Sequence, residues 1–318
     1  MRTIAINEIG ATPAAMNLPD PEPGPAQSRV KIIAAGLNPL DWKIADGALK
    51  DSVPYTFPLV LGVDGAGVVD AAGPDARFGV GEQVFGRFFG VSRGVGTYAE
   101  YAIATEDDAV IPIPEGMLYT KAAALPTAGM TALKVVEEAG VGQAGVEDGK
   151  SVLIVGATGG VGRPAVRLAA SRGATVIATA RPNSAAAMRE LGAAETIDHG
   201  RGDLREQVRA VRRDGVDAII DLVSDRTAAE RLAALLRPGG VYVSTVWAVN
   251  PDALEAQEIR GVNLDYTPTT DLLQRAVELV EAGDMRIEVE EEIPLKEAPA
   301  ALTRSRTGTS SGKTVIRL

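Results

Sequence analysis

The sequence contains no cysteine and a single histidine, His199, among 318 residues. Without thiols the chain forms no disulfide and has no thiol nucleophile. Zinc sites take three or four ligands that are mostly Cys and His, so we expect no metal site. No G-x-S-x-G motif accompanies His199, which argues against a Ser-His-Asp hydrolase.

Long apolar runs and excess positive charge are also missing. The N-terminus, MRTIAINEIG, lacks the apolar core of a signal peptide, and no apolar run is long enough to span a bilayer. A net charge of −10 disfavours binding to nucleic acids and to anionic membranes. We therefore expect a cytoplasmic protein that binds neither, in a chain long enough for two domains.

The most informative segment is Ser151–Arg181, which reads SVLIVGATGGVGRPAVRLAASRGATVIATAR. A strand-like run, Val152–Val155, enters the glycine turn Gly156–Gly162, and an amphipathic helix and a second strand, Thr175–Thr179, follow. In such a unit the glycines let backbone N–H groups approach a pyrophosphate at the helix N-terminus. The spacing is GxxGGxG instead of GxGxxG, but strand, turn, helix and strand together predict a dinucleotide site.

The residues after the second strand indicate which dinucleotide binds. An acidic residue there would hold the ribose 2′-OH of NAD, whereas a cation suits the 2′-phosphate of NADP. The chain has Ala180-Arg181-Pro182-Asn183-Ser184 and no carboxylate before Glu190. Arg181 offers a planar guanidinium suited to phosphate, so we predict NADPH as the cofactor, with Arg181 on its 2′-phosphate.

The first 120 residues read as short strands separated by Pro and Gly, which predicts a β-rich, barrel-like domain. We expect strands at Arg2–Ile6, Arg29–Leu37, Gly65–Ala71, Gln83–Phe89, Thr97–Ala104 and Ala109–Pro112.

After Thr120 the pattern changes to helices and alternating strands. Helices are expected at Lys121–Leu125 and Met130–Ala139, broken by Pro126 and Gly129. The strand and helix alternation that follows predicts a doubly wound parallel sheet of the α/β class. Its further strands are expected at Thr196–Asp198, Ala218–Leu222, Val241–Thr245 after an Arg-Pro-Gly-Gly turn, and Asn263–Thr267. Glu288–Leu318 reads as strand and loop, and we expect it to rejoin the first domain.

Five segments in this order resemble the medium-chain dehydrogenase/reductase superfamily, in its zinc-free quinone oxidoreductase-like branch. Besides the glycine turn they are Gly36–Lys43 (GLNPLDWK), Leu61–Val69 (LGVDGAGVV), Leu125–Ala132 (LPTAGMTA) and Gly312–Val315 (GKTV). In zinc-dependent relatives a Gly-His-Glu stands where this chain has Gly62-Val63-Asp64. The resemblance implies a Rossmann dinucleotide-binding domain at 123–267 and a GroES-like β-rich catalytic domain formed by 1–122 with 268–318.

The resemblance also implies roles for individual residues. The pyrophosphate is expected against Thr158, Gly159, Gly160 and Val161. Asn38 and Thr127 are expected near the nicotinamide, Thr245 and Val246 near its ribose, and Lys313 in the cleft. His199 matches a position beside the adenosine half, although a solvent-facing loop histidine is an equally good interpretation.

Without a metal to polarise a carbonyl, hydride transfer favours acceptors that are already electron-poor, such as quinones and α,β-unsaturated carbonyls. Three residues are candidates for the catalytic groups: Asn38 as a donor to the substrate oxygen, Lys43 as a cation or proton relay, and Tyr55 as a phenolic proton donor. For Lys43 and Tyr55 a purely structural role is the alternative interpretation. Asp41 and Asp64 are interpreted as loop-holding acceptors. Apolar surface for a flat substrate is expected from Phe57, Phe85, Phe88, Phe89 and Trp247, although Phe85–Phe89 is interpreted equally well as the end of a core strand.

The leading hypothesis is therefore a zinc-independent, NADPH-dependent reductase of quinones or enones. Two alternatives stay open, a dedicated enoyl reductase of a biosynthetic pathway and a non-catalytic NADPH-binding redox sensor. Relatives pair through the edge of the nucleotide-binding sheet, so we also expect a homodimer, with Val241–Val249 as the apolar edge.

Overall fold

The computed structural model describes residues 1–142, 149–309 and 311–318. Over these residues the chain divides into two compact units. Unit 1 comprises Met1–Met130, Pro268–Val277 and Ile287–Leu318, and unit 2 comprises Thr131–Thr267 and Glu278–Arg286. The division falls inside two helices, α3 (Pro126–Glu138) and α9 (Thr270–Glu281).

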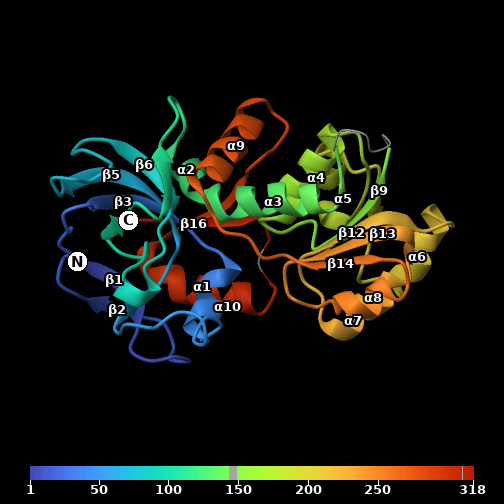
Figure 1. The fold of residues 1–318 in the computed structure, drawn as a ribbon, viewed down its shortest axis with the longest axis horizontal. Helices are drawn as coiled ribbons and strands as arrows, with labels where there is room; N and C mark the ends of the chain where they lie inside the picture. Colours follow the sequence, from blue (N-terminus) through green and yellow to red (C-terminus); the bar gives the residue numbers. More distant parts are fainter. Residues whose placement is uncertain (143–148, 310) are drawn as a thin grey trace. The chain divides into compact units, whose positions relative to one another are not determined.

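Unit 1 is built on two β-sheets. A three-stranded sheet has the order β2-β1-β4, and a seven-stranded sheet has the order β15-β16-β3-β5-β6-β8, with β7 also paired to β3. Figure 1 shows the C-terminal β16 beside the N-terminal β3, and the two strands pair antiparallel, Ile316 opposite Ala35. The strands are β1 (Arg2–Ile6), β2 (Ala14–Asn17), β3 (Ser28–Gly36), β4 (Leu59–Val60), β5 (Asp64–Ala72), β6 (Gln83–Arg87), β7 (Tyr101–Ala104), β8 (Ala109–Pro112), β15 (Val289–Pro294) and β16 (Lys313–Arg317).

Unit 1 also contains short helices, and α1 and α10 contribute buried side chains to its core. The core contains Ile32, Val69, Phe88 and Tyr98 among many buried side chains, because alternate residues of each strand face inward. The helices are α1 (Pro39–Ala45), α2 (Tyr119–Ala124) and α10 (Ala298–Arg306), with single-turn 3₁₀ helices η1 (Val91–Arg93) and η2 (Leu295–Glu297).

Unit 2 is a six-stranded, entirely parallel sheet in the order β11-β10-β9-β12-β13-β14. Its three central strands are mostly apolar and buried (SVLIV, TVIAT and VDAIID), as expected when helices cover both faces of a sheet. In Figure 1, α4 and α5 lie on one face, and α7 and α8 lie on the other. The elements are β9 (Ser151–Val155), α4 (Gly162–Ser171), β10 (Thr175–Thr179), α5 (Pro182–Glu190), β11 (Glu195–Ile197), α6 (Leu204–Val211), β12 (Val216–Asp221), α7 (Arg226–Ala233), β13 (Leu236–Ser244), α8 (Pro251–Glu255) and β14 (Arg260–Asn263).

This strand order is that of a Rossmann fold, with the direction of winding reversing between β9 and β12. The predicted fold class is confirmed. Several element bounds were wrong. The helix break predicted at Pro126 is present, since α2 ends at Ala124 and α3 begins at Pro126, but Gly129 lies inside α3 and does not break it. The sixth strand lies at Arg260–Asn263 instead of Asn263–Thr267, and α10 occupies a segment predicted to be strand and loop.

Candidate functional site

The glycine turn of unit 2 is shaped by backbone requirements that only glycine meets. Gly156 ends β9 with φ +82°, a left-handed conformation that disfavours side chains. At Gly162 a Cβ would lie 2.3 Å from the carbonyl oxygen of Gly156, so the first turn of α4 packs directly on the strand end. The amide of Gly159 closes the turn on Gly156 O at 3.1 Å. Two of the four glycines, Gly156 and Gly162, are thus required by the backbone itself, the first by its dihedral angle and the second by packing.

The N-terminus of α4 is open to a ligand. Its N-cap residue is Val161, whose side chain makes no capping hydrogen bond. Thr158, Gly159, Gly160 and Val161 are all partly exposed. Arg163 donates its amide to Gly159 O at 3.1 Å and Pro164 has no N–H, so the amides that precede Arg163 and the positive end of the helix dipole favour an anion here. The turn therefore fits the pyrophosphate of a dinucleotide, and it gathers the four residues that the sequence assigned to that group.

Arg181 and His199 follow neighbouring strands at the same carboxyl edge of the sheet. Arg181 comes after β10 as the exposed N-cap of α5, and His199 comes after β11 and is also exposed. The amide of Ala180 donates to Ile197 O at 2.8 Å, which holds the two strand ends together. No acidic residue lies in the first turn of α5. The edge therefore carries an exposed guanidinium and an exposed imidazole after two neighbouring strands.

The strand ends on the other side of the switch point are fixed by two buried polar residues. Asp221, at the end of β12, accepts the hydroxyl hydrogen of Tyr242 at 2.7 Å and the amides of Val223 and Ser224. Thr245 donates its amide to Asp221 O at 3.0 Å, and Val246 donates to the Ser244 hydroxyl at 3.2 Å. The structure thus holds Thr245 and Val246 at the same edge as the glycine turn.

In unit 1 a buried carboxylate, Asp64, joins two of the predicted site residues, Asn38 and Thr127. Its Oδ1 accepts the hydroxyl hydrogen of Thr127 at 2.7 Å, and its Oδ2 accepts the Thr127 amide at 3.0 Å and the Asn38 side-chain amide at 2.9 Å. Because Asp64 takes the only O–H of Thr127, the hydroxyl oxygen presents lone pairs alone. In this conformation Thr127 accepts hydrogen bonds and does not donate them.

Lys313 completes this polar cluster, which we define as Asn38, Asp64, Thr127 and Lys313. Its Nζ is buried and donates to Asn38 Oδ1 at 2.7 Å and to Leu37 O at 2.9 Å. Burial lowers the pKa of Lys313, and the charge of Asp64 opposes that change. Burial likewise raises the pKa of Asp64, while Lys313 and the hydrogen bond from Thr127 oppose the rise. Asn38 therefore bridges two buried charges of opposite sign.

This bridging leaves Asn38 without a hydrogen for substrate. Its side chain is 3% exposed, and its Nδ2 points to Asp64 and, at 3.4 Å, to Gly36 O. Donation to a substrate oxygen would require Asn38 to leave one of these two acceptors and the residue to become exposed. The geometry supports a positioning role for Asn38 in place of the predicted oxygen-binding role.

A second buried carboxylate, Asp41, lies beside the polar cluster. Its Oδ2 accepts the Tyr98 hydroxyl hydrogen at 2.6 Å and the Asn38 amide at 2.7 Å, and its Oδ1 has no partner among the described residues. The adjoining cavity of about 10 Å³ holds at most one water. Burial raises the pKa of Asp41 to about 7, and burial together with the charge of Asp41 raises that of Tyr98.

Among the described residues, neither of the other two catalytic candidates hydrogen-bonds to the polar cluster. Tyr55 donates its hydroxyl hydrogen to Ile44 O at 2.9 Å and accepts the Leu49 amide, so its phenol ties a loop to the end of α1. Lys43 is half-buried, with its ammonium 5.8 Å from the ring centroid of Trp42. Burial lowers the pKa of Lys43. Within the described residues its Nζ has no hydrogen bond or ion pair.

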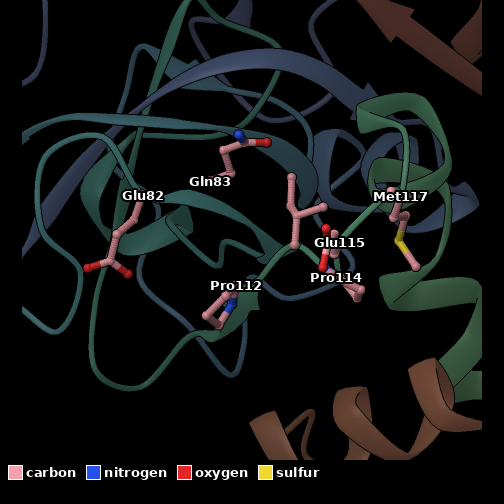
Figure 2. A pocket seen from close by; sticks show the side chains of 8 residues that line it. Glu82, Gln83, Pro112, Pro114, Glu115 and Met117 are labelled. Carbon is pink, nitrogen blue, oxygen red and sulfur yellow. The ribbon is translucent and has the colours of Figure 1, made fainter.

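The aromatic residues divide between core and surface. Phe85 and Phe88 are core side chains, which agrees with the core-strand interpretation and not with a substrate surface, whereas Phe57 and Trp247 are exposed. A cavity of about 380 Å³ in unit 1 contains no member of the polar cluster (Figure 2). It is lined by Glu82, Gln83, Pro112, Ile113, Pro114, Glu115, Gly116 and Met117.

Three residues that matter to this geometry were not predicted as functional. Asp64 was interpreted only as a loop-holding acceptor, and Tyr98 and Asp221 were not singled out. Asp221 carried a usable signal, because a lone carboxylate ends an otherwise apolar strand. Asp64 and Tyr98 gave none, since their partners lie 63 and 57 residues away in the sequence.

Comparison with known proteins agrees with this geometry. Residues 24–115 match the model of the alcohol dehydrogenase GroES-like domain, and residues 191–316 match that of a zinc-binding dehydrogenase family. The quinone oxidoreductase of Mus musculus is 31% identical over 320 residues, which cover 95% of this chain and 92% of that protein. The chain belongs to the medium-chain dehydrogenase/reductase superfamily, in its quinone oxidoreductase-like branch.

Two further relatives span nearly the whole of this chain. The quinone oxidoreductase structure from Coxiella burnetii superposes with a TM-score of 0.85 at 30% identity, covering 100% of this chain and 99% of that one. The mitochondrial NAD(P)H oxidoreductase of Mus musculus is 29% identical over 334 residues, covering 92% of this chain and 82% of that protein. The family assignment made from the five motifs is confirmed.

The distribution of acidic and histidine side chains offers no metal centre in the described parts of the chain. In residues 1–142, 149–309 and 311–318, no three His, Asp or Glu side chains gather as ligands for a metal ion. In the same residues no helix is both long and apolar enough to cross a membrane.

Proposed function

We propose that this protein is a zinc-independent reductase that transfers hydride from NADPH to a quinone or an α,β-unsaturated carbonyl. The glycine turn carries the proposal, because its open helix N-terminus fits a pyrophosphate and its fold is that of a dinucleotide-binding domain. The relatives named quinone oxidoreductase and NAD(P)H oxidoreductase support the reaction class and the nicotinamide cofactor. The missing cysteines and the single histidine support independence from zinc.

We propose NADPH and not NADH because Arg181, which comes after β10, is positively charged. Arg181 follows β10, where an NAD-specific site places a carboxylate for the ribose 2′-OH. A guanidinium instead forms paired charge-assisted hydrogen bonds with a phosphate. His199 stands after the adjacent strand and adds a second polar group on the adenosine side of the same edge.

Bound NADPH would supply a hydride and become NADP⁺, and the acceptor would take up one further proton. A quinone or enone delocalises the added negative charge, so no Lewis acid is required. Lys43 Nζ is the group we assign to that proton, because its ammonium is not consumed by hydrogen bonds to described residues and burial lowers its pKa. Asp64 fixes Thr127, and Lys313 fixes Asn38, so the polar cluster is rigid before any ligand binds.

The test is steady-state oxidation of NADPH by the purified protein with a panel of quinones and enones. We expect turnover with several members of the panel and unchanged rates after chelator is added. NADPH binding without turnover on any acceptor would contradict a reductase and favour a redox sensor. Turnover confined to one large conjugated thioester would favour a biosynthetic enoyl reductase. Loss of activity in chelator would contradict zinc independence.

A further inference from the structure

Trp247 combines two properties that the fold of unit 2 does not require. Its side chain is 61% exposed although it is the largest apolar type. Its backbone is left-handed, with φ +57°, a conformation disfavoured for bulky residues. A glycine would satisfy this backbone at lower cost, and an exposed indole adds little to the core. A strained, exposed aromatic residue points to function.

Neighbouring hydrogen bonds fix this backbone conformation. The hydroxyl of Ser244, fully buried at the end of β13, accepts the amide of Val246 at 3.2 Å and that of Ala248 at 3.2 Å. The two bonds flank Trp247 on both sides. The following residues, Ala248 and Val249, are buried. The segment is therefore anchored before and after the indole, which is held out of the core.

A chain of contacts connects Trp247 with the glycine turn. Thr245, two residues before it, donates its amide to Asp221 O at the end of β12. Asp221 holds the amide of Val223, whose side chain is 64% exposed. A Cβ on Gly156 would lie 2.9 Å from Val223 Cγ1, so Val223 lies over the first glycine of the turn. Two exposed apolar residues, Val223 and Trp247, thus follow the ends of β12 and β13, at the sheet edge where the cofactor is proposed to lie.

We propose that Trp247, with Val223 beside the glycine turn, binds the flat ring of the acceptor and selects planar conjugated acceptors over small acyclic ones. The inference rests on the proposed function. An indole face offers a wide, rigid surface to a quinone ring, and such contacts favour flat aromatic partners. Phe85 and Phe88 are in the core of unit 1 and do not compete for this role.

The experiment compares kcat/KM for 2-methyl-1,4-naphthoquinone with that for methyl vinyl ketone in wild type, Trp247→Gly and Trp247→Phe. We expect Trp247→Gly to lower kcat/KM for the naphthoquinone about three- to tenfold, through KM, and for the enone less than about twofold. Trp247→Phe keeps a ring and is expected to retain most of the preference. Leu118→Ala, at another exposed apolar residue, is the matched control and leaves the ratio unchanged.

The same variants separate recognition from stability. Because glycine relieves the left-handed strain, the thermal midpoint of Trp247→Gly is expected not to fall below that of wild type. An unchanged ratio of the two acceptors in an active Trp247→Gly enzyme overturns the assignment alone. A changed mass in light scattering with an unchanged ratio also overturns it, because Trp247 would then serve contact between copies. A wild-type protein that reduces neither acceptor overturns the proposed function as well.

Discussion

At the scale of single residues, Asp41 is the most unusual group in unit 1. It is 1% exposed, one of its oxygens has no partner among the described residues, and its nearest charged neighbours are Asp64 and Lys313. An unpaired oxygen is less costly on a neutral carboxylic acid than on a carboxylate. Burial accordingly raises the pKa of Asp41 from 3.8 to about 7.

This pKa predicts a pH dependence of stability. Between about pH 4 and 7 the folded protein holds a proton on Asp41 that the unfolded chain releases, so the free energy of unfolding falls as the pH rises through this window. Asp41→Asn keeps an oxygen for Tyr98 and removes the titration. Between about pH 4 and 7 we expect the difference in unfolding free energy between wild type and Asp41→Asn to change by on the order of 2–4 kcal/mol. Urea denaturation at several pH values measures this, and parallel curves would refute it.

At the scale of elements, two glycines of the glycine turn, Gly162 and Gly159, differ in whether the free protein needs them. A Cβ at Gly162 would lie 2.3 Å from Gly156 O, whereas a Cβ at Gly159 would meet the same oxygen at 3.4 Å, an ordinary contact. Gly162 is therefore required by the packing of α4 on β9. Gly159 is compatible with a side chain in the absence of ligand.

The pair Gly162→Ala and Gly159→Ala tests this distinction. Gly162→Ala is expected to lower the thermal midpoint of the free protein by several degrees, because the overlap displaces the turn by a few tenths of an ångström or more. Gly159→Ala is expected to keep the wild-type midpoint. Both are expected to weaken NADPH binding by about tenfold or more, since a methyl group at either position obstructs the phosphates. If Gly159→Ala bound NADPH as tightly as wild type, the pyrophosphate would lie elsewhere.

An element could be predicted from the sequence when the residues that stabilise it are close together in the chain, and not when they are far apart. The apolar strands of unit 2 and the turn after β9 are local patterns, and they were predicted within a few residues. The break at Pro126 was also predicted, because proline is disfavoured inside a helix and common at its first position, whereas Gly129 was wrongly taken to break α3. The sequence of α10 lacks a clear apolar stripe, and its helical state comes from burial of Ala298, Ala301 and Leu302 against unit 1. Lys313 and Asn38 meet across 275 residues, which no local pattern records.

At the scale of the whole molecule, the two units carry different parts of one proposed reaction. Unit 2 presents the glycine turn, Arg181 and His199 at one sheet edge, and unit 1 holds the buried polar cluster. The match of 31% identity over 95% of the chain covers both units, so neither is an addition foreign to the family.

The most direct measurement is calorimetric titration of NADPH and NADH into wild type and Arg181→Ala. We predict that wild type binds NADPH more tightly than NADH. Arg181→Ala is expected to weaken NADPH about tenfold or more, the effect of a lost charge-assisted contact, with little change for NADH. Equal losses for the two nucleotides would contradict the role of Arg181, and no heat with either nucleotide would contradict the account as a whole.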